Sequence, residues 1–216
     1  MTLIASITAA DEAAALATLQ ADPGAAAATD DAGVSALLLA RYRGMGDVVE
    51  AIRALRPLSL PEAAAAGDVR RIATLLAAGT DPETAAPDGF RPVQLALFFD
   101  QLHAAALLLR AGADVDTAAS HPMGVAAIHA AAASPSGAGV ALVVAAGAQL
   151  DATQSGGFTA LHEAAHRGDD AMAELLLGAG ADPARRTDDG RTPADVARAD
   201  GHPDLADRLT EALPHS

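Results

Sequence analysis

The sequence predicts an all-α solenoid, in which helix-turn-helix units stack one after another along a single axis. The phrase Gly-Phe-Thr-Ala-Leu-His-Glu-Ala-Ala begins at Gly157 and returns at Gly190 as Gly-Arg-Thr-Pro-Ala-Asp-Val-Ala, a step of 33 residues (190 − 157 = 33). A second phrase, Gly-Ala followed by Gln or Asp, keeps the same step from Gly147 to Gly180 (180 − 147 = 33). Self-similarity at this period indicates repeats that each bury their apolar face only against their neighbours.

Each unit is expected to read turn, helix, break, helix and loop. Thr159 and Thr192 occupy the N-cap position of a first helix, and Pro193 follows at the first helical position, where its missing N–H costs nothing. A Gly-Asp pair, as at Gly168, ends that helix, and a second helix with a leucine pair or triplet follows. The second helices are expected to end at C′ glycines, namely Gly79, Gly112, Gly147 and Gly180.

The period of 33 and the Thr-Ala-Leu-His phrase at 159–162 resemble the ankyrin repeat, whose pattern contains T-P-L-H-x-A. The resemblance implies an ankyrin-repeat solenoid of parallel helix pairs, with short β-hairpin fingers that project at right angles and form a concave face. It covers nearly the whole chain, residues 1–216, as a single domain. The units are placed at about 1–29 for an N-terminal cap, then 30–55, 56–86, 87–121, 122–154 and 155–187, and at about 188–213 for a C-terminal cap.

Three departures from the repeat pattern predict local irregularities. Arg56 opens a unit only 23 residues after Gly33 (56 − 33 = 23), so one finger is expected to be missing. Two corresponding glycines are 35 residues apart rather than 33 (124 − 89 = 35), so the loop 117–123 carries two extra residues. The segment Ser-Pro-Ser-Gly at 134–137 replaces the usual break in the fourth unit and is predicted to shorten that helix.

The composition excludes several kinds of chemistry. The sequence contains neither cysteine nor lysine, which rules out disulfides, thiolate catalysis, cysteine zinc sites, Schiff-base chemistry and a P-loop lysine. Its Ala-, Arg- and Gly-rich, Lys-free usage is typical of a GC-rich bacterial genome. The formal net charge of −14 argues against a nucleic-acid partner and favours, if the partner is charged, a basic protein surface.

The hydrophobic content of 51% is not a membrane signal. The longest apolar runs, such as 104–109, fall far short of the roughly 20 residues that a membrane span requires. The N-terminus has no positive residue before its apolar stretch and makes a poor signal peptide. We therefore expect a cytoplasmic protein without a membrane association, and a monomer.

The letters His-Glu-Ala-Ala-His at 162–166 match H-E-x-x-H, in which two histidines on one helix face bind zinc and the glutamate acts as general base. A metal-dependent hydrolase that uses His162, Glu163 and His166 is therefore one alternative. Against it, the resemblance assigns His162 to the structural histidine of the T-x-L-H turn, and His129 holds the same place one unit earlier (162 − 129 = 33). No third ligand with a matching signature follows, so we predict a protein without metal or cofactor that is not an enzyme.

In ankyrin proteins the last two residues of each first helix and the fingertips line the concave groove. This implies a set of candidate partner-binding residues, namely Tyr42, Arg43, Phe90, Phe98, Phe99, Phe158, His166, Arg167 and Arg191. The set contains every aromatic residue of the chain, one Tyr and four Phe, and aromatic and Arg side chains are enriched at binding hot spots. Alternatively, Phe98 and Phe99 pack between neighbouring helices or cover the missing finger.

The leading hypothesis for function is a non-enzymatic module that binds another protein through the concave face of the stack. Besides the hydrolase, a third hypothesis is an accessory protein that protects another enzyme from damage or aggregation. The sequence names no partner.

Overall fold

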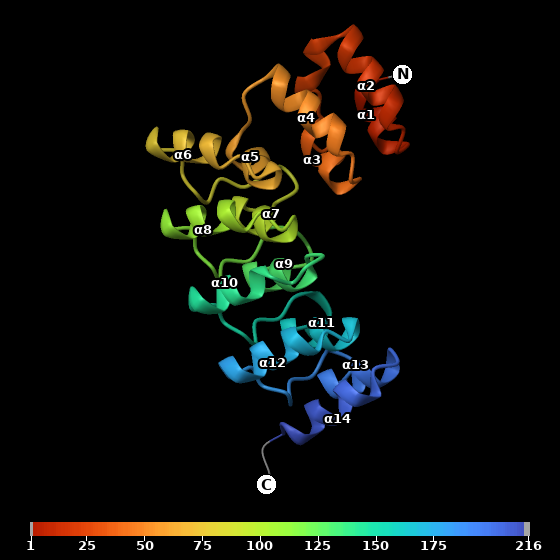
Figure 1. The fold of residues 1–216 in the computed structure, drawn as a ribbon, viewed down its shortest axis with the longest axis vertical. Helices are drawn as coiled ribbons and strands as arrows, with labels where there is room; N and C mark the ends of the chain where they lie inside the picture. The colour runs from red at the N-terminus through yellow and green to blue at the C-terminus, as the bar shows by residue number, and fades with distance from the viewer. Residues whose placement is uncertain (1, 214–216) are drawn as a thin grey trace.

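The computed structural model describes residues 2–213, which form a column of helix pairs (Figure 1). The first helices of the pairs are α1 (Leu3–Thr8), α3 (Ala36–Tyr42), α5 (Leu60–Ala66), α7 (Pro92–Phe98), α9 (Ala127–Ala133), α11 (Ala160–Arg167) and α13 (Pro193–Ala199). The second helices are α2 (Glu12–Ala21), α4 (Gly46–Leu55), α6 (Val69–Ala77), α8 (Leu102–Arg110), α10 (Gly139–Ala145), α12 (Asp170–Ala179) and α14 (Pro203–Glu211). Two 3-10 helices, η1 (Pro23–Ala27) and η2 (Ser155–Gly157), lie in connections. The predicted all-helical stack is confirmed.

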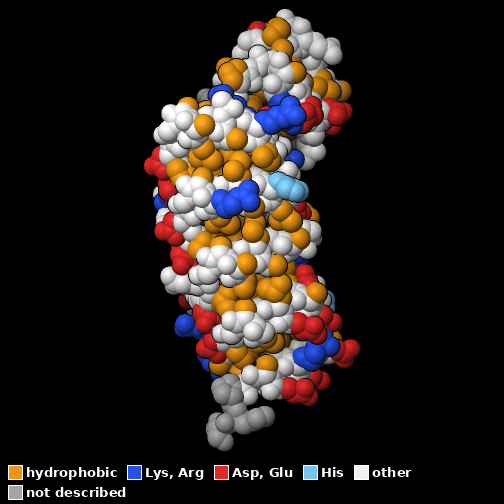
Figure 2. All heavy atoms as spheres, turned by 60° about the vertical axis from the view of Figure 1, so that its left-hand side comes forward, with side chains coloured by type: hydrophobic (Ala, Val, Ile, Leu, Met, Phe, Trp, Pro, Cys, Tyr) orange, Lys and Arg blue, Asp and Glu red, His pale blue; other side chains and the backbone are white. Residues whose placement is uncertain are grey.

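The core runs along the whole column and consists mainly of Ala, Leu, Val and Ile side chains. Runs of fully buried alanine, such as 63–65 on α5, allow the first helices to approach one another closely. Figure 2 turns the side with α6, α8, α10 and α12 toward the viewer and shows hydrophobic side chains between successive units. Among residues 2–213, no helix has both the length and the apolar character that crossing a bilayer would demand.

Glycine in the left-handed conformation ends the first helices where the sequence predicts a Gly-Asp break. Gly67 (φ 69°) and Gly168 (φ 64°) are the C-caps of α5 and α11. The following Asp68 and Asp169 then cap the N-termini of α6 and α12, because their carboxylates accept hydrogen bonds from backbone N–H groups in the first turn.

The segment Ser-Pro-Ser-Gly at 134–137 does not shorten the first helix of the fourth unit, although the sequence predicted that it would. Helix α9 has 7 residues, as many as α7, so the first helix of this unit is not shortened. The second helix, α10, is short instead, with 7 residues against 9 in α8. Asp100 of the preceding unit compensates: its carboxylate accepts hydrogen bonds from the backbone N–H (3.1 Å) and the hydroxyl (2.6 Å) of Ser136.

The fingers, the turns that precede the first helices, are not β-hairpins. Within residues 2–213 the extended pairing is limited to two isolated bridges, Thr29 with Ser35 and Gln154 with Phe158. Each turn closes within a few residues, which is too short for a ladder. Backbone hydrogen bonds join successive fingers instead, from Ser120 N to Gly89 O (3.0 Å), from Ser155 N to Met123 O (2.8 Å) and from Asp188 N to Gly156 O (2.9 Å).

A polar side chain at the third position of each first helix from α5 onward reaches back to the N-cap. Its acceptor atom takes the backbone N–H of the cap residue, which has no partner within the helix. The acceptors, with distances to the cap nitrogen, are Glu62 Oε2 (2.9 Å), Gln94 Oε1 (2.9 Å), His129 Nδ1 (3.1 Å), His162 Nδ1 (3.2 Å) and Asp195 Oδ2 (3.0 Å).

In the three middle units the same side chain also reaches forward to the next unit. Gln94 Nε2 donates to the carbonyls of Thr117 and Val125, both at 2.9 Å. His129 Nε2 lies 2.9 Å from Ala152 O, and His162 Nε2 lies 3.2 Å from Arg191 O. Each of these rings therefore accepts at Nδ1 and donates at Nε2, which is the neutral tautomer. Burial lowers the pKa of both histidines, consistent with this arrangement.

The junction between α4 and α5 replaces the missing finger with an ion pair. Only four residues, 56–59, join the two helices, and α3 and α4 are tilted against the units that follow (Figure 1). The Arg56 guanidinium pairs with the buried Glu62 carboxylate, and Arg56 Nε donates to Ala26 O at 2.8 Å. Burial raises the pKa of Glu62, but hydrogen bonds from Arg56, Ser35 and Ser59 outweigh it and hold that pKa at about 2.

The first testable prediction concerns the two buried histidines. Their pKa values are lowered from 6.5, so their stabilising contribution is complete above pH 6.5 and is lost as the pH falls toward the lowered values. The unfolding free energy of the wild type should therefore fall between about pH 7.5 and about pH 5.5. The double variant His129→Gln/His162→Gln should fold and lose much less, because Gln94 makes the same bonds without titrating. Urea unfolding at both pH values measures this, and equal losses in the two proteins would contradict it.

The second prediction concerns the junction. Glu62→Gln should lower the unfolding free energy by about 3 kcal/mol at neutral pH, because the partly buried Arg56 loses its counter-charge. The pKa of Glu62 is about 2 in the fold and 4.5 ordinarily, so the wild type keeps this contribution above pH 4.5 and loses it as the pH falls toward 2. Glu50→Gln is the control, because the exposed Glu50–Arg53 pair contributes at most about 1 kcal/mol. Equal effects of the two substitutions in urea unfolding would refute the role of the pair.

Candidate functional site

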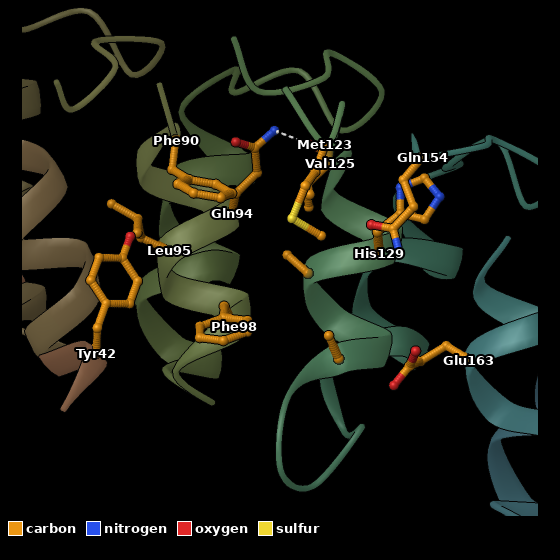
Figure 3. Close-up of a pocket in the computed structure, with 12 residues that line it drawn as sticks. Tyr42, Phe90, Gln94, Leu95, Phe98, Met123, Val125, His129, Gln154 and Glu163 are labelled. Atoms are coloured by element: carbon orange, nitrogen blue, oxygen red, sulfur yellow. Dashed lines mark hydrogen bonds between the residues drawn. The ribbon is translucent and has the colours of Figure 1, made fainter. Parts of the chain in front are cut away.

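A groove of about 370 Å³ crosses the stack from α3 to α11, beside the fingers (Figure 3). Its larger apolar lining side chains are Tyr42, Phe90, Leu95, Phe98, Met123 and Val125. Its polar side chains are Gln94, His129, Gln154 and Glu163. The amide of Gln94 and the ring of His129 are held by the hydrogen bonds that fix the fingers, so these two walls are rigid.

Three of the nine residues predicted to bind a partner line this groove. Tyr42 and Phe98, each 39% exposed, come from the ends of α3 and α7, and Phe90 comes from a fingertip. The Phe90 ring stacks on the ring of His121 at 4.9 Å between centroids, which fixes one edge of the groove. Figure 3 shows these three rings on one side of the groove and Met123 on the opposite side.

Phe99 lies beneath this surface and holds the tilted junction together. Its ring centroid is 5.5 Å from that of Tyr42 and 5.1 Å from that of Phe98, and the Arg41 guanidinium lies 4.4 Å from it. These contacts join α3 directly to the end of α7, although α5 lies between the two helices in the chain. In α5 the positions that correspond to Phe98 and Phe99 hold the small residues Ala65 and Ala66. The structure thus gives Phe99 the packing role that the sequence left open for it.

Tyr42 is both a packing residue and a groove residue. Its hydroxyl donates to Asp88 Oδ2 at 2.8 Å, which connects α3 to the finger before α7. Burial and the neighbouring Asp88 carboxylate raise the pKa of Tyr42, so the phenol stays a protonated donor. The exposed part of its ring forms one end of the groove (Figure 3).

The other predicted residues are not among those that line the groove. Arg43 is exposed at the C-cap of α3. The Arg191 guanidinium lies 6.0 Å from the Phe158 ring and pairs with Asp189 at 2.8 Å, and His166 Nδ1 lies 2.7 Å from Asp200 Oδ2. The groove therefore includes only part of the predicted set.

Arg167 has its guanidinium bound within the fold. It donates to the carbonyls of Ala132 (2.7 Å), Ser134 (2.6 Å) and Pro135 (3.0 Å). These carbonyls belong to the end of α9 and the irregular break that follows, so Arg167 supplies the cap that the Ser-Pro-Ser-Gly sequence lacks. This contact places Arg167 in the packing of α9 against α11.

The H-E-x-x-H letters do not assemble a zinc site. His162 is completely buried, and both of its ring nitrogens are engaged in the hydrogen bonds that hold Thr159 and the next finger. His166 is exposed and bonded to Asp200, on the next unit. Within residues 2–213 no group of three or more His, Asp or Glu side chains is arranged to hold a metal ion. The structural role predicted for His162 agrees with these hydrogen bonds.

The sequence prediction missed Met123, Gln154 and Glu163 as groove residues. A signal for Met123 was present, because the segment 117–150 contains no charged residue over 34 positions (151 − 116 − 1 = 34) in a chain of net charge −14. This segment supplies α9 and the loop with Met123, which is 46% exposed. The sequence analysis considered Glu163 only as part of the H-E-x-x-H match, and in the structure it lies half-buried at the end of the groove.

Comparison with known proteins agrees with the architecture. Residues 143–197, from within α10 to within α13, match the family model of ankyrin repeats (many copies), which confirms the resemblance over these residues. A comparison with curated proteins gives no match.

The third prediction separates the two adjacent phenylalanines. Phe99→Ala should lower the unfolding free energy by about 2 kcal/mol or more, because it removes the ring on which Arg41 and Tyr42 pack. Phe98→Ala should cost less than about 1 kcal/mol, because that ring is 39% exposed. Urea unfolding followed by circular dichroism compares the two, and an equal or reversed order would show that the packing assignment is wrong.

Proposed function

We propose that the chain, whose residues 143–197 match ankyrin repeats, is an interaction module whose protein partner occupies the groove lined by Tyr42, Phe90, Phe98 and Met123. Ankyrin repeats generally mediate contacts between proteins. The proposal assigns this role to one particular part of the stack, where the first helices and the fingers meet.

The distribution of exposed apolar side chains supports this choice. Among residues 2–213, the exposed large hydrophobic side chains are Tyr42, Leu55, Val69, Phe98 and Met123. Three of these five line the same groove, although they come from three different units of the chain. Apolar side chains that gather in a hollow of the surface are typical of interaction sites, whereas single exposed ones need no explanation.

The rigidity of the side chains that line the groove also favours binding. The aromatic rings are fixed by stacking and hydrogen bonds, as in Phe90 on His121 and Tyr42 on Asp88. A partner would therefore bind a preorganised surface and lose little free energy to the ordering of side chains. Met123 is the adaptable element, because its unbranched side chain fits partners of different shape.

An accessory role toward another enzyme would use this same groove, with that enzyme as the partner. A hydrolase centred on His162 has no support in the geometry, because catalysis there would require the ring to leave the hydrogen bonds that hold its finger.

The fourth prediction tests the groove. Phe98→Asp should leave the helical circular dichroism signal and the melting temperature nearly unchanged and weaken partner binding at least about thirtyfold, as expected for a hot spot. Partners are captured from extracts of the source cells, identified by mass spectrometry, and titrated against the purified variants.

Val69→Asp is the matched control. Val69 is exposed to a similar degree, 37%, but lies at the start of α6 outside the groove. If Phe98→Asp binds like the wild type, or if Val69→Asp loses binding equally, the groove is not the partner site.

A further inference from the structure

Glu163 is the one acidic side chain that lines the groove, and its carboxylate has no hydrogen-bond or ion-pair partner within residues 2–213. It projects from α11 toward the groove at the end opposite Tyr42 (Figure 3). A cation one helical turn later, Arg167, would be its ordinary partner. That guanidinium instead points to the carbonyls of Ala132, Ser134 and Pro135, and Glu163 stays unpaired.

The remainder of the groove offers Glu163 no other positive charge. The segment 117–150, which forms the middle of the groove, contains no charged residue, and burial keeps His129 neutral. At the other end, Asp88 is already occupied, because it accepts the Tyr42 hydroxyl at 2.8 Å and the Phe90 N–H at 3.2 Å. Among its lining side chains the groove therefore carries one charge, the free carboxylate of Glu163 at the α11 end.

We propose that the groove recognises a linear segment of the partner in which apolar side chains are followed by an arginine or lysine that pairs with Glu163. This inference rests on the proposed function and specifies the chemistry of its ligand. The volume of about 370 Å³ is at the small end for binding pockets and is enough for a few side chains of such a segment.

The energetics favour a cation at this position. A guanidinium or ammonium that pairs with this carboxylate makes a charge-assisted hydrogen bond, which is stronger than one between neutral groups. The net charge of −14 attracts a basic segment over a longer range and repels an acidic one. The apolar side chains provide the affinity, and Glu163 determines the direction in which the segment lies.

A selection from a phage-displayed library of random short peptides tests the proposal and does not require the natural partner. The full chain should enrich peptides that combine apolar residues with Arg or Lys at a constant spacing. The variant Glu163→Arg should enrich Asp or Glu at that position instead. Glu174→Arg is the matched control, because Glu174 is an exposed residue of α12 outside the groove, and it should select the same peptides as the wild type.

A synthetic peptide from the wild-type pool then gives the magnitude. Its affinity for Glu163→Gln should be about tenfold weaker, the loss of one charge-assisted contact, with an unchanged melting temperature. Replacement of its Arg or Lys by Gln should weaken binding to the wild type by the same factor and have little effect on binding to Glu163→Gln.

The outcomes separate this inference from the proposed function. Peptides that are lost with Phe98→Asp but show no charge preference that follows Glu163 overturn the inference and leave the groove as a binding site. Peptides that are insensitive to Phe98→Asp, or no enrichment at all, overturn the inference, whereas the proposed function is overturned only by the capture experiment with Phe98→Asp and Val69→Asp. Concentration-dependent dimers in sedimentation that Phe98→Asp abolishes would assign the groove to a second copy of the chain and also overturn the inference.

Discussion

The stack depends on one hydrogen-bonding arrangement, the polar side chain at the third position of a first helix that binds the cap N–H behind it and the next finger ahead of it. Because the fingers contain only isolated bridges within residues 2–213, no sheet holds them in place. Glutamine and neutral histidine suit this position because each offers an acceptor and a donor on one rigid group. Gln94 shows the consequence for the groove, since its bonds to Thr117 O and Val125 O fix both ends of the loop that carries Met123.

Where the arrangement changes, the stack changes shape. Glu62 has acceptors but no donor, so it cannot donate to a carbonyl of the next finger. It follows the four-residue link that lacks a finger, and its carboxylate accepts the Ser59 N–H and pairs with the Arg56 guanidinium. The tilt of α3 and α4 at this point leaves space beside Ala65 and Ala66, which the Tyr42–Phe99–Arg41 cluster fills. The exposed rings of Tyr42 and Phe98 therefore lie in a groove that spans the junction without a finger.

The features predicted correctly are those that depend on a few neighbouring residues. The caps at Thr159 and Thr192, the Gly168 break and the buried His162 follow from local hydrogen bonding within one unit, and the 33-residue period repeats them. The groove could not be derived in this way, because it joins side chains from four units across a tilted junction. The repeat register placed Phe98 and Phe99 in one row, but in the structure Phe98 faces the groove while Phe99 packs against Tyr42 of α3.

The irregular break at 134–137 connects the fold to the chemistry of the groove. A regular unit would carry Gly-Asp here, and the left-handed glycine and the aspartate would satisfy the two helix ends locally. With Pro135 in that place, the carbonyls at the end of α9 need a donor from outside, and Arg167 supplies it. Asp100 satisfies Ser136 from the other side, in the left-handed conformation with φ of 56° that Asp tolerates better than most residues. Since Arg167 is used in this way, Glu163 keeps an unpaired charge at the groove, so the same substitution that disturbs the repeat leaves a carboxylate free to select a cationic ligand.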